Sequence, residues 1–244
     1  IPYETDFTLI GTTDADHEDP QKKPICTPAE RNYLIEFINE YLAEPITSED
    51  IVWTFSGVRP LYNDGAKSAS AATRDYVLKL DQSCGAPTLN VFGGKITTYR
   101  RLAESALEKI SEAIPVVRDK WTAGVALPGG DFEVDGVNSL ISATQAAYPF
   151  LTDRWAKRLI RAYGSEVNDI LGDAEFASDL GINFGAELTQ REVEWLIKNE
   201  YVQTADDIVW RRTKLGLRMT TEQIQSIEDW IIAQRCKVRI KAAE

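Results

Sequence analysis

Hydrophobic and polar positions follow different patterns in the two halves of this 244-residue chain. In the first half, short runs rich in β-branched and aromatic residues predict strands at Asp6–Ile10, Ile51–Phe55, Tyr76–Leu80 and Thr88–Phe92. Helices are predicted after Thr27 and from Thr97 to Ile114, where apolar residues recur every three or four positions. The first half is therefore expected to form part of a mixed-sheet domain.

The two helices of the first half are each predicted to bury one face. The first has the start signal Thr27-Pro-Ala-Glu30, with threonine as N-cap and glutamate completing a capping box, and Pro45 is predicted to stop it. Its expected buried face consists of Tyr33, Leu34, Phe37, Ile38, Tyr41 and Leu42. The expected buried face of the second consists of Ile96, Tyr99, Leu102, Ala103, Ala106, Leu107 and Ile110.

From residue 136 onward the pattern predicts helices only. Helical spacing occurs at Val137–Tyr148, Thr152–Leu171, Thr189–Tyr201, Ala205–Leu215 and Thr220–Lys241, with a loop at Gly181–Gly185. Thr152, Thr189 and either Thr220 or Thr221 are predicted N-caps. The sequence thus predicts an α+β protein with a partial mixed-sheet domain at residues 1–115, a linker at 116–135 and an all-helical domain at 136–244.

Charge and composition narrow the classes of function. The formal net charge of −11 argues against a general nucleic-acid binder, which normally has a basic face. No apolar run approaches the roughly 18 residues of a spanning helix, and none is typical of a signal peptide. Cys26, Cys84 and Cys236 are scattered, which predicts reduced thiols in a cytosolic protein and no metal site. His17 is expected to be solvated in its acidic loop rather than to act as a ligand or base.

A glycine pair joins a predicted strand to a predicted helix in Phe92-Gly-Gly-Lys-Ile-Thr-Thr-Tyr-Arg100. Gly93 and Gly94 lack Cβ, so a bound group can approach their N–H groups closely. Thr97 or Thr98 is predicted to cap the helix, whose N-terminus favours an anion beside the charge of Lys95. The plainer alternative is a strand-to-helix corner with a solvated lysine.

Two arginines add to this lysine. Arg59 follows a Ser-Gly turn and precedes a proline, which restricts its direction, and Arg74 lies at the start of a predicted strand. Taken alone, each is expected to be a surface or ion-paired residue. With Lys95 they form three cations at strand ends, and such a set suits an anionic substrate such as a phosphate.

A series of segments, taken in order, resembles the C-terminal half of bacterial FAD-dependent glycerol-3-phosphate dehydrogenase. The matching segments are Ile10-Gly-Thr-Thr-Asp14, Ile51-Val-Trp-Thr-Phe-Ser-Gly-Val-Arg-Pro-Leu61, Thr73-Arg-Asp-Tyr76, Val91-Phe-Gly-Gly-Lys-Ile-Thr-Thr-Tyr-Arg100, Leu127-Pro-Gly-Gly130, Tyr148-Pro-Phe-Leu-Thr152, Ser178-Asp-Leu-Gly181 and Ala205-Asp-Asp-Ile-Val-Trp-Arg-Arg-Thr-Lys214. The family's Gly-x-Gly-x-x-Gly fingerprint and its base histidine belong to the N-terminal half and are absent here. We therefore expect a fragment that starts within a domain.

The resemblance implies oxidation of sn-glycerol 3-phosphate to dihydroxyacetone phosphate, with hydride transfer to FAD and electrons passed to quinone. It implies that the first domain contacts FAD through Gly93, Gly94, Lys95, Ile96, Thr97 and Thr98. Arg59, Arg74 and Lys95 are the implied substrate cations. Arg59 could instead face the substrate hydroxyl and act in catalysis, and the assignment among the three cations stays open.

The expected partners are glycerol 3-phosphate, a quinone, the missing N-terminal half and a second copy of the chain in a homodimer. Peripheral contact with the inner face of the cytoplasmic membrane is expected from basic helices around Arg154–Arg161 and Trp210–Arg218, or from Arg100 and Arg101. Two alternatives remain. One is a related flavin amine or amino-acid oxidase, and the other is a helical interaction or membrane-docking module without enzymatic activity.

Overall fold

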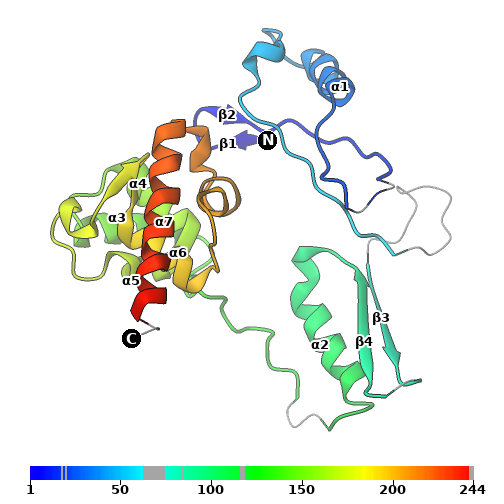
Figure 1. Cartoon of the computed structure of the whole chain (residues 1–244). Coiled ribbons are helices and arrows are strands. Elements are labelled where there is room, and N and C mark those ends of the chain that lie inside the picture. The colour runs from blue at the N-terminus through cyan, green and yellow to red at the C-terminus, as the bar shows by residue number, and fades with distance from the viewer. Residues whose placement is uncertain (18, 20, 63–74, 84, 116–118, 242–244) are drawn as a thin grey trace. The chain divides into compact units, whose positions relative to one another are not determined.

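The computed structural model describes residues 1–17, 19, 21–62, 75–83, 85–115 and 119–241 (Figure 1). Contacts within the chain divide it into an N-terminal unit, Ile1–Gly124, and a C-terminal unit, Val125–Glu244. Almost all side-chain burial belongs to the second unit: every buried side chain among the described residues lies between Ile141 and Ile231. The two units therefore differ sharply in how completely they enclose a core.

The N-terminal unit consists of short elements. They are β1 (Pro2–Tyr3), β2 (Phe7–Thr8), α1 (Pro28–Asn39), the 3₁₀ turn η1 (Ser48–Asp50), β3 (Tyr76–Asp81), β4 (Thr88–Gly93), the 3₁₀ turn η2 (Ile96–Thr98) and α2 (Tyr99–Ile110). Its strands pair as two separate antiparallel hairpins, β1–β2 and β3–β4. The described residues thus form no mixed sheet.

Two other predictions for this unit were wrong. Residues 51–55 form no strand, because no neighbouring strand among the described residues pairs with them. The predicted apolar face of α1 is not buried either, and Tyr33, Phe37, Tyr41 and Leu42 are exposed. The predicted start of α1 is confirmed: Thr27 and Glu30 form a capping box around Pro28 at the first helical position.

The β3–β4 hairpin and α2 pack against each other in the N-terminal unit. Tyr76 pairs with Gly93, and Asp81 pairs with Thr88 at the other end. Helix α2 contacts both strands, and the hydroxyl groups of Tyr76 and Ser105 lie 3.1 Å apart. The predicted inner face of α2 is confirmed only in part: Leu102, Ala106 and Ile110 are half-buried, while Ile96, Tyr99, Ala103 and Leu107 are exposed because a two-stranded hairpin covers only part of a helix.

The C-terminal unit is mainly helical (Figure 1). Its elements are α3 (Val137–Ala147), α4 (Asp153–Tyr163), η3 (Gly164–Glu166), α5 (Val167–Leu171), η4 (Ala177–Leu180), β5 (Asn183–Gly185), β6 (Leu188–Thr189), α6 (Gln190–Asn199), the π-helical turn η5 (Asp207–Arg212), η6 (Leu215–Leu217) and α7 (Thr221–Lys241). The fully buried Leu159, Ile170, Leu196, Ile208 and Ile227 show that successive helices share one core.

This unit corrects the prediction of an all-helical domain. The segment predicted as a loop forms the first strand of the β5–β6 hairpin, whose turn residues Ala186 and Glu187 have positive φ. The predicted helix Thr152–Leu171 is interrupted at Gly164, which has φ +55°. The Thr152 hydroxyl caps α4 and the Thr220 hydroxyl accepts from the backbone N–H of Gln223, as predicted, but Thr189 makes no capping hydrogen bond.

Candidate functional site

The Gly93–Gly94 turn lies where β4 ends. Both glycines have positive φ, +69° and +95°, a conformation that favours residues without Cβ. A Cβ on Gly93 would lie 3.3 Å from the carbonyl oxygen of Asp75, and one on Gly94 would lie 3.2 Å from the Tyr76 Cβ. The glycines therefore let the turn pack directly against the first residues of β3.

The same turn contacts the segment that carries Arg59. The Cβ position of Gly93 lies 3.5 Å from the Pro60 carbonyl oxygen and 3.5 Å from the Tyr62 amide nitrogen. The Tyr62 ring packs on Phe92 with centroids 5.5 Å apart, and its hydroxyl accepts a 2.6 Å hydrogen bond from Lys79 Nζ. The backbone after Arg59 and the glycine turn are thus neighbours, although they are distant in sequence.

Arg59 forms an ion pair rather than standing alone. Its Nη1 lies 2.6 Å from Asp14 Oδ1, and the two side chains are 46% and 48% exposed. Lys95 is exposed next to the turn, with no ion pair to any described residue. Arg74 lies outside the described residues, so the convergence of the three predicted cations stays a prediction. The structure brings together the backbone segments of the other two.

The predicted cap of the following helix was wrong. The Thr98 hydroxyl donates a 2.9 Å hydrogen bond to the Lys95 carbonyl oxygen and caps no helical N–H group. Thr97 is exposed, and Ile96 is 88% exposed. Residues 94–97 therefore present an open helix start, whose first N–H groups have no partner within the helix.

This open start fits one edge of a flavin, as the resemblance implies. The first N–H groups of η2 and α2, together with the Lys95 charge, suit the negatively charged edge of a reduced isoalloxazine ring. The exposed Ile96 side chain supplies an apolar contact beside them. These residues would contact only the ring, because the chain has no Gly-x-Gly-x-x-Gly turn for the pyrophosphate.

Two residues beside the predicted site had no role in the sequence analysis. Asp14 belongs to the Gly-Thr-Thr-Asp segment that carries the resemblance, but no spacing rule links it to an arginine 45 positions later. Tyr62 follows Arg59 by three residues and packs the segment on β4. The carboxylate at the end of a turn-forming segment was the only signal available for Asp14.

His17 and the cysteines do not form a site in the described residues. His17 is exposed, and its Nε2 lies 2.8 Å from the Lys22 carbonyl oxygen. Cys26 and Cys236 are free thiols, and Cys84 lies outside the described residues. Over the part of the chain that the structure describes, no three histidine, cysteine or carboxylate side chains gather as metal ligands.

A buried charge network lies in the C-terminal unit, between α4 and α6. Arg158 donates to both carboxylate oxygens of Glu192 at 2.7 Å, and the Tyr163 hydroxyl donates to the same carboxylate at 2.7 Å. Burial followed by the Glu192 charge raises the pKa of Tyr163 well above 10.0. Burial alone would lower the pKa of Arg158, but the adjacent Glu192 carboxylate outweighs it and raises this pKa. The network holds two helices together.

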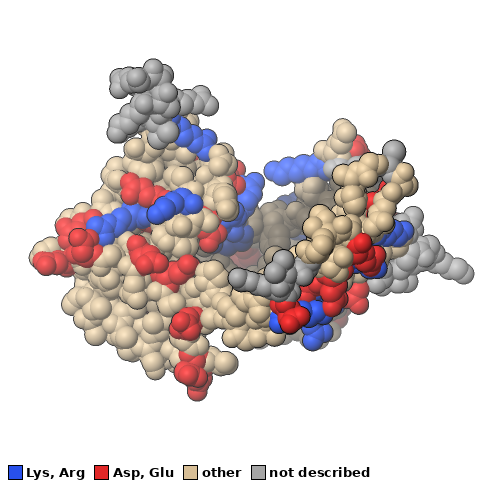
Figure 2. Space-filling model, turned by 90° about the horizontal axis from the view of Figure 1, so that it is seen from below, with Lys and Arg blue, Asp and Glu red and all other residues tan. Residues whose placement is uncertain are grey.

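Most arginines of the predicted membrane-facing helices are paired within the protein. Arg154 lies 3.2 Å from Glu187, Arg211 lies 3.0 Å from Asp207, and Arg212 lies 3.1 Å from Glu200. Figure 2 shows basic side chains next to acidic ones, without a broad basic face in that view. No helix in the described residues is both long and apolar enough to cross a bilayer.

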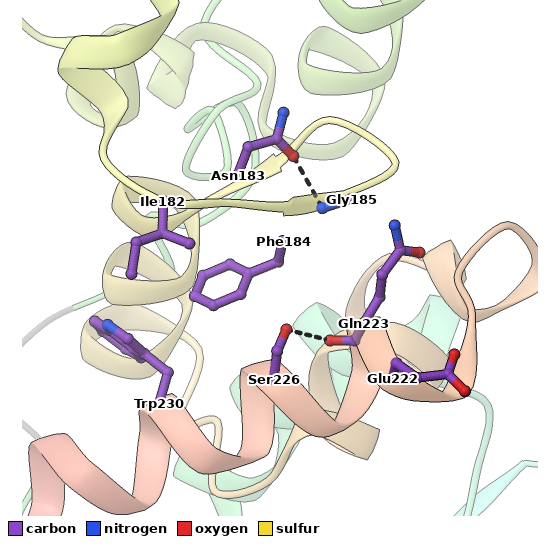
Figure 3. Close-up of a pocket in the computed structure, with 8 residues that line it drawn as sticks. All are labelled: Ile182, Asn183, Phe184, Gly185, Glu222, Gln223, Ser226 and Trp230. Carbon is purple, nitrogen blue, oxygen red and sulfur yellow. Dashed lines mark hydrogen bonds between the residues drawn. The ribbon is translucent and has the colours of Figure 1, made fainter.

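An open groove of about 490 Å³ lies between β5 and the first turns of α7 (Figure 3). Phe184 and Trp230 form its apolar floor, with ring centroids 6.0 Å apart and an interplanar angle of 72°. Asn183, Gln223 and Glu222 lie along its rim. The groove has no cationic side chain among its lining residues, so its chemistry does not suit a phosphate.

Comparison with known proteins defines the class first. Residues 120–236 match the family described as the C-terminal domain of alpha-glycerophosphate oxidase, so the C-terminal unit is a domain of that class. The chain is 41% identical over 95% of its length to aerobic glycerol-3-phosphate dehydrogenase of Escherichia coli (strain K12). It is 41% identical over 91% of its length to glycerol-3-phosphate dehydrogenase of Pseudomonas aeruginosa. It is 38% identical over 94% of its length to D-erythritol 1-phosphate dehydrogenase of Brucella abortus.

These comparisons confirm the resemblance. The chain is similar over nearly all of its length to bacterial aerobic glycerol-3-phosphate dehydrogenase, and the match of residues 120–236 to a C-terminal domain is consistent with the C-terminal half of such a protein. It spans about half the length of the curated relatives it matches, covering 46%, 46% and 44% of the three proteins named above.

Proposed function

We propose that this chain forms the C-terminal half of a flavin-linked dehydrogenase that oxidises sn-glycerol 3-phosphate to dihydroxyacetone phosphate and passes the electrons to quinone. The observation that carries the proposal is the 41% identity over 95% of the chain to an aerobic glycerol-3-phosphate dehydrogenase. The packing of the glycine turn against the Arg59 segment supports it, because a turn that is proposed to face the flavin then lies beside a cation. In this proposal the assembled enzyme is the complete polypeptide, and this chain is its C-terminal half.

The residues divide into two roles. Gly93, Gly94, Ile96, Thr97 and Thr98 contact the isoalloxazine ring through the open helix start. Lys95 contributes its charge there or to the substrate phosphate. When bound, FAD supplies the acceptor for the hydride that leaves the substrate carbon. The protein's task is to bind the substrate, orient that carbon and shield the site from water.

Arg59 and Arg74 are proposed to bind the substrate. A phosphate needs fixed cations, and an arginine can offer it two parallel N–H donors. Arg59 has a second candidate role, in which its guanidinium stabilises the charge that develops on the substrate oxygen as the hydroxyl proton leaves. The contact of Pro60 and Tyr62 with Gly93 supports either role, since it holds the Arg59 backbone close to the flavin-facing turn.

D-erythritol 1-phosphate is a second candidate substrate. The chain is 38% identical over 94% of its length to a D-erythritol 1-phosphate dehydrogenase, which is close to its identity with the glycerol 3-phosphate enzymes. Both substrates are polyol monophosphates, so the same cations suit both. The two substrates differ by one CHOH group, which would be recognised elsewhere in the pocket. The extra carbon alone changes binding by about 1–3 kcal/mol.

An enzyme that reduces quinone must reach the bilayer. We propose that the assembled enzyme lies on the cytoplasmic side and contacts the inner face of the membrane peripherally, with a homodimer as its assembly. Exposed basic side chains on α4, Lys157 and Arg161, support a contact with anionic lipid. Direct binding of nucleic acid is not proposed, because the net charge is −11.

A turnover assay tests the proposal. The purified assembled enzyme is supplied with FAD and a dye acceptor, and dye reduction is measured with glycerol 3-phosphate, D-erythritol 1-phosphate, glycerol and a panel of amino acids. We expect a flavin absorbance band and turnover of a polyol phosphate but not of glycerol, because the phosphate supplies the binding energy. Turnover of amino acids alone would favour an amino-acid oxidase. Absence of bound flavin would favour a non-enzymatic interaction module.

A further inference from the structure

Asp14 and Arg59 form the one ion pair among the described residues that reaches across the N-terminal unit to the candidate site. Nη1 of Arg59 donates to Oδ1 of Asp14 at 2.6 Å, across 45 positions of sequence. A guanidinium has five N–H donors, so contact through one Nη atom leaves it able to bind a second anion. The pair is therefore compatible with a substrate phosphate or oxyanion on the same arginine.

The loop that carries Asp14 is anchored to a helix start. The neighbouring Thr13 donates its hydroxyl to Glu30 Oε1 at 2.8 Å, while Glu30 Oε2 accepts from the backbone N–H and hydroxyl of Thr27 at 2.9 and 2.7 Å. These hydrogen bonds, led by that of the Thr27 backbone, lower the pKa of Glu30 and keep it ionised at neutral pH. Asp14 thus extends from a loop that the capping box of α1 holds in place.

The backbone of Arg59 is anchored separately. The Leu61 amide donates to the Arg59 carbonyl oxygen at 2.8 Å, and Pro60 and Tyr62 contact Gly93. The Arg59 side chain is about half exposed, so packing alone does not fix its direction. A carboxylate held by a different anchor is a direct means of orienting such a long side chain.

The energetics favour orientation over stability as the role of the pair. An ion pair between half-exposed side chains contributes little to folding, because water screens it and two long side chains lose freedom. Ordering one side chain before substrate arrives removes that cost from binding. A gain of this kind appears in substrate affinity and leaves the melting temperature unchanged.

We propose that Asp14 is a positioning residue, whose carboxylate holds the Arg59 guanidinium in the direction in which it meets the substrate. This inference rests on the proposed function and assigns Asp14 a role in binding the polyol phosphate. Asp14 itself does not touch the substrate in this proposal. It acts through Arg59.

The first test replaces Asp14 by Asn in the assembled enzyme, with Asp16→Asn as the matched control. Both changes remove one negative charge from the same loop, and Asp16 is exposed. We expect Asp14→Asn to lower kcat/KM for the polyol phosphate by about 3- to 10-fold, mainly through KM, as for the loss of one pre-ordered side chain. Asp16→Asn should match wild type, and both variants should melt at the wild-type temperature.

A double-mutant comparison separates this role from a general disturbance of the loop. Because Asp14 acts through Arg59, adding Asp14→Asn to Arg59→Ala should cause no further loss of kcat/KM. Asp14→Glu keeps the charge and should recover part of the loss caused by Asn. If Asp14→Asn unfolds the enzyme, Asp14→Glu is compared with wild type instead. A raised KM at the wild-type melting temperature supports the inference, and a KM equal to that of Asp16→Asn counts against it.

Several results would overturn the inference. They are additive losses in the double variant, a lower KM in Asp14→Asn, or equal behaviour of Asp14→Asn and Asp16→Asn in an active enzyme. A wild-type enzyme that oxidises no polyol phosphate would reject the proposed function together with this inference. An active wild type with an unaffected Asp14→Asn variant would reject the inference alone.

Discussion

Arg59 is the described residue of the candidate site whose charge is easiest to remove without disturbing a core. Its side chain is about half exposed, and its backbone is fixed by Leu61 and by the contacts of Pro60. Replacement by alanine should therefore leave the fold intact. It removes a cation that can bind the substrate phosphate or stabilise a developing oxyanion.

We expect Arg59→Ala in the assembled enzyme to lower kcat/KM for glycerol 3-phosphate. The corresponding loss of transition-state stabilisation should be about 1.5–3 kcal/mol, the contribution of a charge-assisted hydrogen bond. Steady-state dye reduction measures this change. The control is Arg101→Ala, which removes an exposed arginine from α2. Equal efficiency of Arg59→Ala and wild type would exclude both roles proposed for Arg59.

Tyr163 shows how one buried hydroxyl links stability to pH. It donates to Glu192 and stays protonated in the fold, because burial and the Glu192 charge raise its pKa well above 10.0. In the unfolded chain the same phenol ionises near pH 10. As pH rises above about 10, the unfolded state releases this proton while the folded state retains it, so the free energy of unfolding falls.

Tyr163→Phe removes this proton and the hydrogen bond together. The variant should be less stable than wild type at pH 7, by about 1–3 kcal/mol for a hydrogen bond to a charged group, and the deficit should shrink above pH 10. Urea unfolding of the chain at several pH values measures the deficit. Tyr201→Phe, at an exposed tyrosine, should show neither effect. A deficit that grows with pH would contradict the assigned protonation.

At the scale of elements, the junction of α4 and η3 is held by two glycines. Gly164 ends α4 with φ +55°, and a Cβ there would lie 1.8 Å from the Gly129 carbonyl oxygen. The Ser165 amide donates to that same oxygen at 3.0 Å. The segment before α3 is thus docked on the junction through backbone atoms that cannot move aside easily.

Gly164→Ala should destabilise the C-terminal unit more than Gly172→Ala does. The two glycines have φ of +55° and +56°, so alanine meets a similar backbone cost, about 1–3 kcal/mol, at both. At Gly172 the added Cβ meets the flexible guanidinium of Arg191, whereas at Gly164 it meets backbone. We expect an additional loss of about 1–3 kcal/mol for Gly164→Ala in thermal unfolding. Equal losses of stability in the two variants would show that the segment before α3 moves aside for the added Cβ without a cost.

Elements with local signals could be predicted from the sequence, and elements that depend on distant partners could not. The capping box at Thr27 and the cap at Thr152 are each formed by residues within one turn, and both were predicted. The β5–β6 hairpin was missed because its turn uses Ala186 and Glu187 rather than the usual glycine or asparagine. The guanidinium groups of Arg154 and Arg158, both distant in sequence, hold that turn in place through Glu187.

The candidate site follows the same division. The glycine turn was predicted because strand, glycine pair and helix are consecutive in sequence, and the structure shows both glycines with positive φ. The Asp14–Arg59 pair was not predicted, because its two residues lie 45 positions apart and no spacing rule links them. The Thr98 cap was predicted wrongly because a 3₁₀ turn precedes α2 and redirects the hydroxyl to Lys95.

At the scale of the whole molecule, peripheral membrane contact depends on cations that the protein does not already pair. Arg211 and Arg212 are bound to Asp207 and Glu200, while Lys157 and Arg161 on α4 are exposed. Each basic residue near an anionic membrane contributes about 1 kcal/mol of attraction, and this falls as salt screens it. The α4 pair is therefore the stronger candidate of the two.

Vesicle sedimentation tests this difference. The vesicles contain about 30 mol% phosphatidylserine, which makes about one lipid in three anionic. Binding of the assembled enzyme to these vesicles should weaken as salt is added. Lys157→Gln with Arg161→Gln should weaken binding by up to about 2 kcal/mol, whereas Arg211→Gln with Arg212→Gln should change it less. Salt-insensitive binding would instead indicate insertion of apolar side chains and would exclude a basic-helix contact.

The contrast between the two units leads to the last prediction. The C-terminal unit encloses a continuous core, whereas the N-terminal unit leaves Phe37, Tyr41, Val91 and Phe92 exposed among its described residues. A region without buried side chains gains little hydrophobic stabilisation and should open readily. We infer that these faces of the N-terminal unit are covered by the dinucleotide-binding half in the assembled enzyme.

The chain expressed by itself should therefore fold in its C-terminal unit only. It should neither bind FAD nor oxidise glycerol 3-phosphate, because one turn at Gly93–Gly94 cannot hold a cofactor whose pyrophosphate has no binding loop in this sequence. Hydrogen exchange should show protected amides in α4, α6 and α7 and rapid exchange in β3 and β4. Supplying the N-terminal half separately should protect β3 and β4, since unpaired strand edges favour association. Tight FAD binding or dye reduction by the isolated chain would show that the N-terminal unit is complete in itself.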